Sequence, residues 1–101
     1  MSLKASFIFL ISIANSAIDR NVASTSSTEL TAGGTASYDD AESVASDPVA
    51  IGIEAIELCG GFGTAGVERI SRTFNRKAAV GAVRFDIHPG LVNKSGDAVY
   101  G

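Results

Sequence analysis

The feature that most constrains this chain is the alternation of apolar segments with helical patterns along its length. Four apolar segments cover residues 6–12, 28–32, 53–59 and 78–87, with helical candidates between them. Strands that alternate with helices are typical of βαβ units, in which the strands are parallel and the crossovers right-handed. The pattern predicts one small three-layer α/β domain over residues 1–101, with a mainly parallel four-stranded sheet in the flavodoxin-like order 2-1-3-4. A ferredoxin-like α+β fold is the alternative; it would pair strands antiparallel and needs only two helices.

The first two apolar segments differ in character. Ser6–Ser12 is a continuous apolar run, typical of a strand buried on both faces. The run also resembles a signal peptide, but its Phe and Ile content favours a strand. No segment approaches the roughly 20 apolar residues of a membrane span, so we expect no membrane partner. Thr28–Ala32 alternates like a short edge strand, and we expect it to end at Gly33-Gly34.

Two helices are expected in the first half of the chain. Ser16 could cap a short helix that carries Ile18 and Val22 four residues apart. A second helix has Asp39 as N-cap and Glu42 three residues later, which is a capping-box-like pair. Pro48 interrupts this helix, so the helix either kinks there or gives way to a new turn capped by Asp47.

The second half of the chain shows a clearer helix. Val67, Ile70 and Phe74 form an apolar stripe at helical spacing. Glu68 and Arg72 are an i,i+4 pair on its outer face. After Pro89 the chain turns polar, and we expect this tail to wrap the surface or a neighbouring subunit.

Composition excludes several classes of partner and site. The net charge is −3 and the eight basic residues are scattered, so we expect no nucleic acid partner. Cys59 is the only cysteine, which excludes an internal disulfide and a multi-cysteine zinc site and suits a cytoplasmic location. With a single histidine as well, we expect no metal and no cofactor. So short a chain exposes much apolar surface, which favours a homo-oligomer.

A glycine-rich loop follows the third predicted strand. The residues Gly60, Gly61, Phe62 and Gly63 come after Cys59 and precede the clearest helix. Glycines let the backbone approach a ligand, and free N–H groups at a helix start attract anions, so this loop could hold a phosphate or carboxylate. It is neither a Walker loop nor a dinucleotide fingerprint. The alternative is a tight turn in which Phe62 plugs the core.

A second candidate lies at the end of the fourth predicted strand. His88 is the only histidine, and it would share one end of the sheet with Cys59. A Cys–His nucleophile pair oriented by Asp86 is geometrically conceivable. The alternative is a surface histidine before a proline, together with a small buried cysteine.

Two charges inside apolar strands suggest a polar stripe. If Glu57 lies beside Arg84, strand alternation places Cys59 and Asp86 on the same face, with His88 at the end. This stripe could line a polar pocket. A structural ion pair and a subunit contact are equally compatible with it.

Three strings of residues resemble those of a known family. These strings are Ile56-Glu57-Leu58-Cys59-Gly60-Gly61-Phe62-Gly63, Val83-Arg84-Phe85-Asp86-Ile87-His88-Pro89-Gly90 and Lys94-Ser95-Gly96-Asp97. The chain resembles a family of small bacterial proteins catalogued as a domain of unknown function. The resemblance covers most of the chain and implies a small α/β protein, but no activity. Pro48 looks like a departure from the family pattern.

Three hypotheses of function follow from these residues. The first is a module that binds an anionic small metabolite at the Gly60–Gly63 loop, with Arg84 and His88 nearby. The second is a small enzyme that uses Cys59 or His88. The third is a structural or assembly protein.

Overall fold

The computed structural model of the protein describes residues 3–47, 50–74 and 77–101. Within these residues the strands are β1 (Leu3–Leu10), β2 (Arg20–Ser24), β3 (Thr28–Thr35), β4 (Ala55–Leu58) and β5 (Ala79–Ala82). The α-helices are α1 (Tyr38–Ser43), α2 (Thr64–Thr73) and α3 (Gly96–Tyr100). Short 3-10 helices follow α1 and β5, at η1 (Val44–Ser46) and η3 (Pro89–Leu91).

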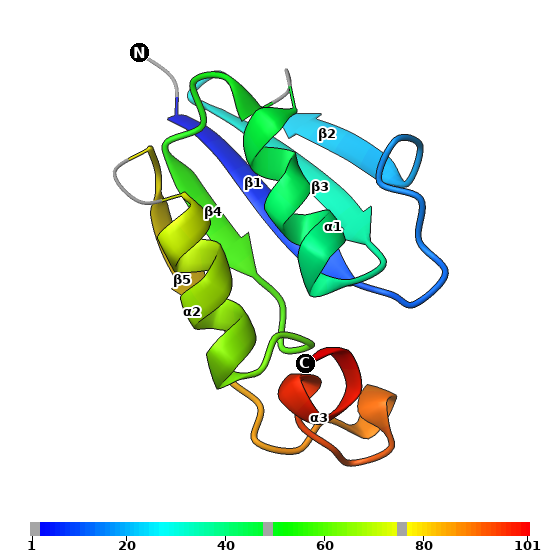
Figure 1. The fold of residues 1–101 in the computed structure, drawn as a ribbon. Coiled ribbons are helices and arrows are strands. Elements are labelled where there is room, and N and C mark those ends of the chain that lie inside the picture. Colours follow the sequence, from blue (N-terminus) through cyan, green and yellow to red (C-terminus); the bar gives the residue numbers. More distant parts are fainter. Residues whose placement is uncertain (1–2, 48–49, 75–76) are drawn as a thin grey trace.

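The strands form one mixed sheet in the order β2-β3-β1-β4-β5 (Figure 1). Neighbouring strands are parallel except β2, which pairs antiparallel with β3. The α/β class is therefore confirmed. The four-stranded flavodoxin-like description is not, because β2 adds a fifth, antiparallel strand. The ferredoxin-like alternative would pair the other strands antiparallel, which their observed register excludes.

The helix predicted from Ser16 is wrong, because residues 20–24 form an edge strand that pairs antiparallel with β3. The hydroxyl of Thr25 accepts hydrogen bonds from the N–H groups of Ser27 and Thr28, at 3.3 and 3.1 Å, and closes the turn between β2 and β3. Ile18 and Val22 stay exposed, by 72% and 50% of their surface. A helix built on these two side chains would have had no core to pack against.

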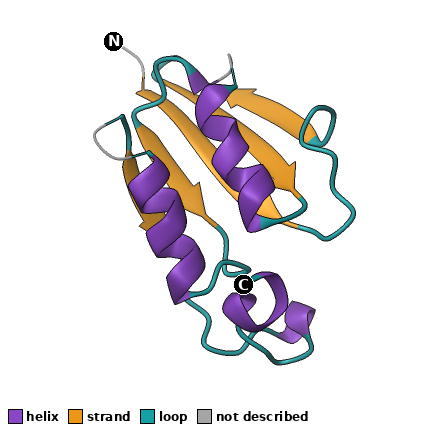
Figure 2. Ribbon diagram, in the orientation of Figure 1, coloured by secondary structure: helices purple, strands orange, loops and turns teal. Residues whose placement is uncertain are grey.

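Both long connections cross on the same face of the sheet. Figure 2 shows α1 and α2 in front of the strands. The connections from β3 to β4 and from β4 to β5 both step across the sheet toward the β5 edge. Because both crossovers are right-handed, they place α1 and α2 on the same face. The step from β1 to β3 runs the other way, and a helix there would cover the opposite face. That step is made by β2 instead, so the sheet has one helix layer and not the predicted two.

The core lies between this helix layer and the sheet. Ile8, Ile56 and Leu58 project from the central strands and are almost fully buried. From α2 and its C-cap, Ile70 and Phe74 meet them, with exposed fractions of 0% and 3%. The predicted apolar stripe is thus confirmed, and so is the ion pair of Glu68 with Arg72 on its outer face.

Several boundaries differ from the prediction. Ser37, not Asp39, is the N-cap of α1, since its side chain accepts from the N–H of Asp40 at 3.0 Å. β3 does not stop at Gly33-Gly34 and is not an edge strand. β5 ends at Ala82, although apolar residues continue to position 87. Pro48, which was expected to interrupt the second helix, lies outside the described residues.

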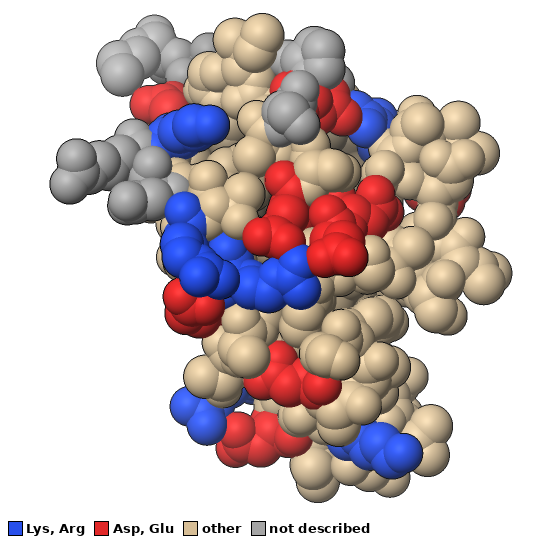
Figure 3. Space-filling view, in the orientation of Figure 1, with Lys and Arg blue, Asp and Glu red and all other residues tan. Residues whose placement is uncertain are grey.

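The C-terminal tail folds back onto the carboxyl ends of the central strands. Its last helix, α3, lies below the start of α2 (Figure 1, red). Above it, on the helix face, basic and acidic side chains lie next to each other over α1 and α2 (Figure 3). In part this reflects Arg69 of α2, which forms ion pairs with Asp39 and Glu42 of α1. Among the described helices, none has the length and apolar character needed to cross a membrane.

Candidate functional site

The glycine loop between β4 and α2 is packed tightly against the rest of the protein. Phe62 is 1% exposed, and its ring stacks on that of Tyr38 with 5.6 Å between centroids. A Cβ on Gly60 would lie 2.1 Å from the Phe85 ring, and one on Gly63 would lie 2.3 Å from the Asp97 carboxyl carbon. Side chains cannot fit at these two positions, so the loop needs glycine for close packing.

The first turn of α2 already holds an anion, which is the carboxylate of Asp97. The N–H groups of Ala65 and Gly66 donate to its two oxygens, at 2.9 and 3.0 Å. The Tyr38 hydroxyl donates to the same carboxylate at 2.8 Å and accepts from the N–H of Gly63 at 2.9 Å. The helix start therefore attracts negative charge, as the sequence indicated. An external anion would have to displace Asp97 to reach these amides.

Burial and hydrogen bonding move the pKa values of Tyr38 and Asp97 in opposite directions, up for the phenol and down for the carboxyl. Burial raises the pKa of Tyr38 to about 12, and the neighbouring Asp97 carboxylate adds to the increase. Burial alone would also raise the pKa of Asp97, but hydrogen bonds from Ala65, Tyr38 and Gly66 lower it below its usual value. At neutral pH the phenol is consequently the proton donor and the carboxylate the acceptor.

Neither Tyr38 nor Asp97 was predicted as a member of this site. A signal for Asp97 was available, because the N-cap of α2 is Gly63, which has no side chain to accept from the first-turn amides. An acceptor must then come from elsewhere in the chain. The sequence offers no means of choosing Asp97 over the other acidic residues.

The predicted polar stripe does not form. In the register of β4 and β5, Glu57 lies opposite Gly81 and not Arg84. Arg84 lies beyond the end of β5, where its guanidinium pairs with Asp86 at 2.9 Å. Both side chains of this pair are more than three-quarters exposed, and Glu57 is exposed on the opposite sheet face. The assumption that Glu57 lies beside Arg84 is therefore wrong, and the structural ion pair that depended on it does not form.

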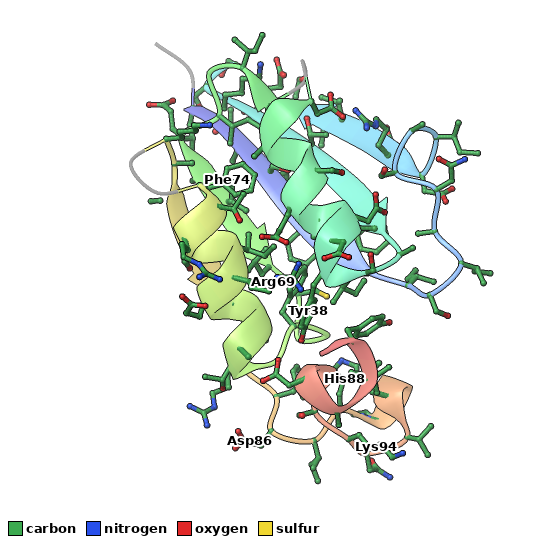
Figure 4. All side chains as sticks on the ribbon, in the orientation of Figure 1. Tyr38, Arg69, Phe74, Asp86, His88 and Lys94 are labelled. Atoms are coloured by element: carbon green, nitrogen blue, oxygen red, sulfur yellow. The ribbon has the colours of Figure 1, made fainter. Side chains whose placement is uncertain are left out.

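The structure does not join Cys59, Asp86 and His88 into one hydrogen-bonded group. Cys59 is half-buried, and its sulfur accepts from the N–H of Gly61 at 3.3 Å. The Nδ1 atom of His88 accepts from the N–H of Gly90 at 2.9 Å. Figure 4 shows Asp86 at the outer edge of the C-terminal segment, away from His88. In residues 3–47, 50–74 and 77–101, no hydrogen bond gives Cys59 a base.

A cleft of about 230 Å³ lies beside the glycine loop, between the end of β5 and the start of α2. It is at the carboxyl ends of parallel strands, where α/β proteins bind ligands. Three predicted ligand residues line it, namely Phe62, Gly63 and Arg84, and Gly60 packs behind it against Phe85. The rest of the lining is mostly apolar and was not predicted: Thr64, Val67, Ala82, Val83 and Phe85.

Comparison with known proteins identifies a family without an assigned activity. A family model described as a family of unknown function, DUF6506, matches residues 3–98. Searches of curated proteins and of solved structures found no significant match. Since the family model spans nearly the whole chain, from β1 into α3, the resemblance to a family of unknown function is confirmed. This chain belongs to the DUF6506 family.

Proposed function

We propose that the protein binds a small anionic ligand in the cleft between β5 and α2, with Arg84 as the counter-charge. The observation that supports this proposal is a concave site at the carboxyl ends of β4 and β5, with apolar walls and one guanidinium. Its volume of about 230 Å³ favours a compact ligand. A carboxylate or phosphate attached to a short apolar group fits this description.

Arg84 is well suited to exchange its present partner for a ligand. Its pair with Asp86 is exposed on both sides, by 76% and 78% of the side-chain surface. Exposed pairs of this kind contribute roughly 0–1 kcal/mol, so little opposes their separation. A guanidinium also binds carboxylates and phosphates through two parallel N–H groups. The first-turn amides of α2 stay hydrogen-bonded to Asp97, and Arg84 pairs with the negative charge of the ligand.

The test is a thermal-shift screen of phosphorylated and carboxylated metabolites, followed by titration of the compounds that raise the melting temperature. Arg84→Gln should weaken binding roughly tenfold, since it removes a charged hydrogen-bond donor. Arg72→Gln is the matched control, because Arg72 is also an exposed arginine paired with a carboxylate, and it lies outside the cleft. Failure of every compound, or unchanged binding by Arg84→Gln, would refute the proposal.

A second candidate function is self-assembly through the uncovered face of the sheet. The observation that favours it is the row of small and apolar residues that the register places there: Ala23, Leu30, Ala5, Ala55 and Ala79. Phe7 and Phe9 extend this row along β1, and no described helix covers it. We propose a homo-oligomer that buries this face, to be tested by its mass in solution. The free Cys59 is consistent with the cytoplasmic location that we also propose.

A further inference from the structure

A second, smaller cavity lies away from the cleft beside α2, between the sheet and the segment that begins with η1. Its volume is about 30 Å³, and its walls come from β1, β3 and the segment that follows α1. It shares no lining residue with the cleft beside α2. Apolar side chains such as Ile8, Val44 and Ile53 form much of the wall. Polar groups nevertheless meet inside it, and these decide what it can hold.

Two hydroxyl side chains lie side by side in the lining of this cavity. Ser6 of β1 and Thr31 of β3 are register partners, and they are only 5% and 6% exposed. Within the described part of the chain, neither hydroxyl has a hydrogen-bond partner. Every side-chain oxygen that is fully enclosed there does have a partner, so these two oxygens are not fully enclosed. The two hydroxyls must therefore open onto the cavity. A hydroxyl that opens onto a cavity and has no partner in the protein favours a hydrogen-bonding occupant there.

Gly33 keeps the space above these hydroxyls open. It lies two residues after Thr31 in β3, on the same face of the sheet, and it lines the cavity. A Cβ on Gly33 would have no neighbour within 4 Å. Glycine weakens an interior strand, and it often marks a point where a ligand approaches the backbone. Here the missing side chain is what leaves room for an occupant.

The charges around the cavity balance. Arg20, the first residue of β2, pairs with Asp47 at 2.9 Å, and its guanidinium also donates to the carbonyl of Ser16. These two charged side chains are about one-quarter exposed, at 27% and 24%. Because one positive and one negative group offset each other, the lining selects neither an anion nor a cation. A neutral hydrogen-bonding ligand fits best.

We infer that this cavity is a binding site for ordered water, held by the hydroxyls of Ser6 and Thr31 above Gly33. Its volume leaves room for about two water molecules, since one needs roughly 10–15 Å³ measured in this way. Each water bonds one of the two hydroxyls, and the side chains of Arg20 and Asp47 line the same cavity. The site gives β1 and β3 a polar contact to the segment that follows α1.

The experiment compares Gly33→Ala with Gly81→Ala by oxygen-17 relaxation dispersion of the solvent, which detects water held longer than the protein takes to tumble. The added methyl group of Gly33→Ala occupies the site, so the signal of held water should fall. Gly81 also has open space around its Cβ but lies in β5, outside the cavity, so Gly81→Ala should keep the full signal. A wild-type protein without held water, or equal signals from both variants, would overturn the inference.

A second pair of variants covers the case in which Gly33→Ala does not fold. Thr31→Val removes one of the cavity hydroxyls at nearly constant shape and should shorten the residence of the water. Thr35→Val is the control: Thr35 lines the same cavity, but its hydroxyl already donates to the carbonyl of Phe9 at 3.0 Å, so its loss should leave the water signal unchanged. If Thr31→Val leaves the water signal unchanged, the hydroxyls do not hold the water.

Discussion

At the scale of single residues, the site beside the glycine loop is organised by Asp97. Its carboxylate occupies the position where an external anion was expected, at the amides of Ala65 and Gly66. Tyr38 completes the arrangement by joining this carboxylate to the N–H of Gly63. A backbone contact seals it, because a Cβ on Gly96 would lie 1.9 Å from the Gly61 carbonyl oxygen. The tail thus acts as the cap that Gly63 cannot provide.

The cap predicts an acid-dependent stability that Asp97→Asn should reduce. Hydrogen bonding lowers the folded-state pKa of Asp97, so its carboxylate stabilises the fold above the unfolded value of about 3.9. That contribution disappears as the pH falls through the lower folded-state pKa. We expect Asp97→Asn to lower the free energy of unfolding by about 1 kcal/mol at pH 7 and by much less near pH 3, in urea titrations.

Asp86→Asn is the control for this prediction. Its carboxylate belongs to an exposed ion pair with Arg84, which contributes little to stability. The free energy of unfolding of Asp86→Asn should match that of the wild type at pH 7 and near pH 3. A difference between Asp97→Asn and wild type that does not shrink in acid would contradict the role given to the charge.

Residue types could be predicted better than residue partners. The sequence indicated that Phe62 could plug the core and that a helix start would attract an anion, and both are seen. The sequence also suggested that Glu57 could lie beside Arg84, which is not observed, because alternation gives the face of a residue but not its register. The register of β4 against β5 depends on where α2 ends and how the chain returns, and no local pattern encodes that.

At the scale of elements, prediction succeeded where an apolar period faced a core. The stripe on α2 identifies its buried side because Ile70 and Phe74 have a sheet to pack against. β2 was missed because its residues are exposed apart from a half-buried Arg20, so burial left no periodic signal. The information lay in the turn between β2 and β3, where the hydroxyl of Thr25 closes a hairpin.

A glycine inside α2 gives a prediction that opposes helix propensity. Gly66→Ala should raise helix propensity by about 1 kcal/mol, but its Cβ would lie 2.4 Å from the Tyr38 ring. The ring stacks on Phe62 and its hydroxyl is bonded to Asp97 and Gly63, so we expect a net loss of about 1–3 kcal/mol in the free energy of unfolding. Denaturant titration measures this. Glu68→Ala, on the exposed face of the same helix, should stay within about 0.5 kcal/mol.

A stabilised Gly66→Ala would show that Tyr38 moves freely. In that case the contact of Tyr38 with Asp97 would not be part of the rigid core.

At the scale of the whole molecule, the unusual property is a sheet covered on one face only. Replacing a crossover helix by β2 removes the second helix layer, and the face that it would cover remains accessible. Beyond the end of β1 the apolar surface continues, with Ile11 and Ile13 exposed by 47% and 89%. Apolar surface of this extent is typical of an interface. An exposed Glu57 in its middle must be desolvated when a partner binds, which sets a limit on affinity.

The proposed homo-oligomer makes the last prediction. Ala32 of β3 lies next to Phe7 on the open face, so Ala32→Glu should place a charge inside the interface without touching the core. We expect the wild-type protein to have at least twice the monomer mass in sedimentation equilibrium, and Ala32→Glu to be monomeric. Ala98→Glu adds the same charge at an exposed position of α3, three residues after its Ser95 N-cap, where a glutamate suits the helix start. It should keep the wild-type mass. A monomeric wild type would contradict the proposal that the open face binds a second copy of the chain. An oligomeric Ala32→Glu would show that the interface lies elsewhere.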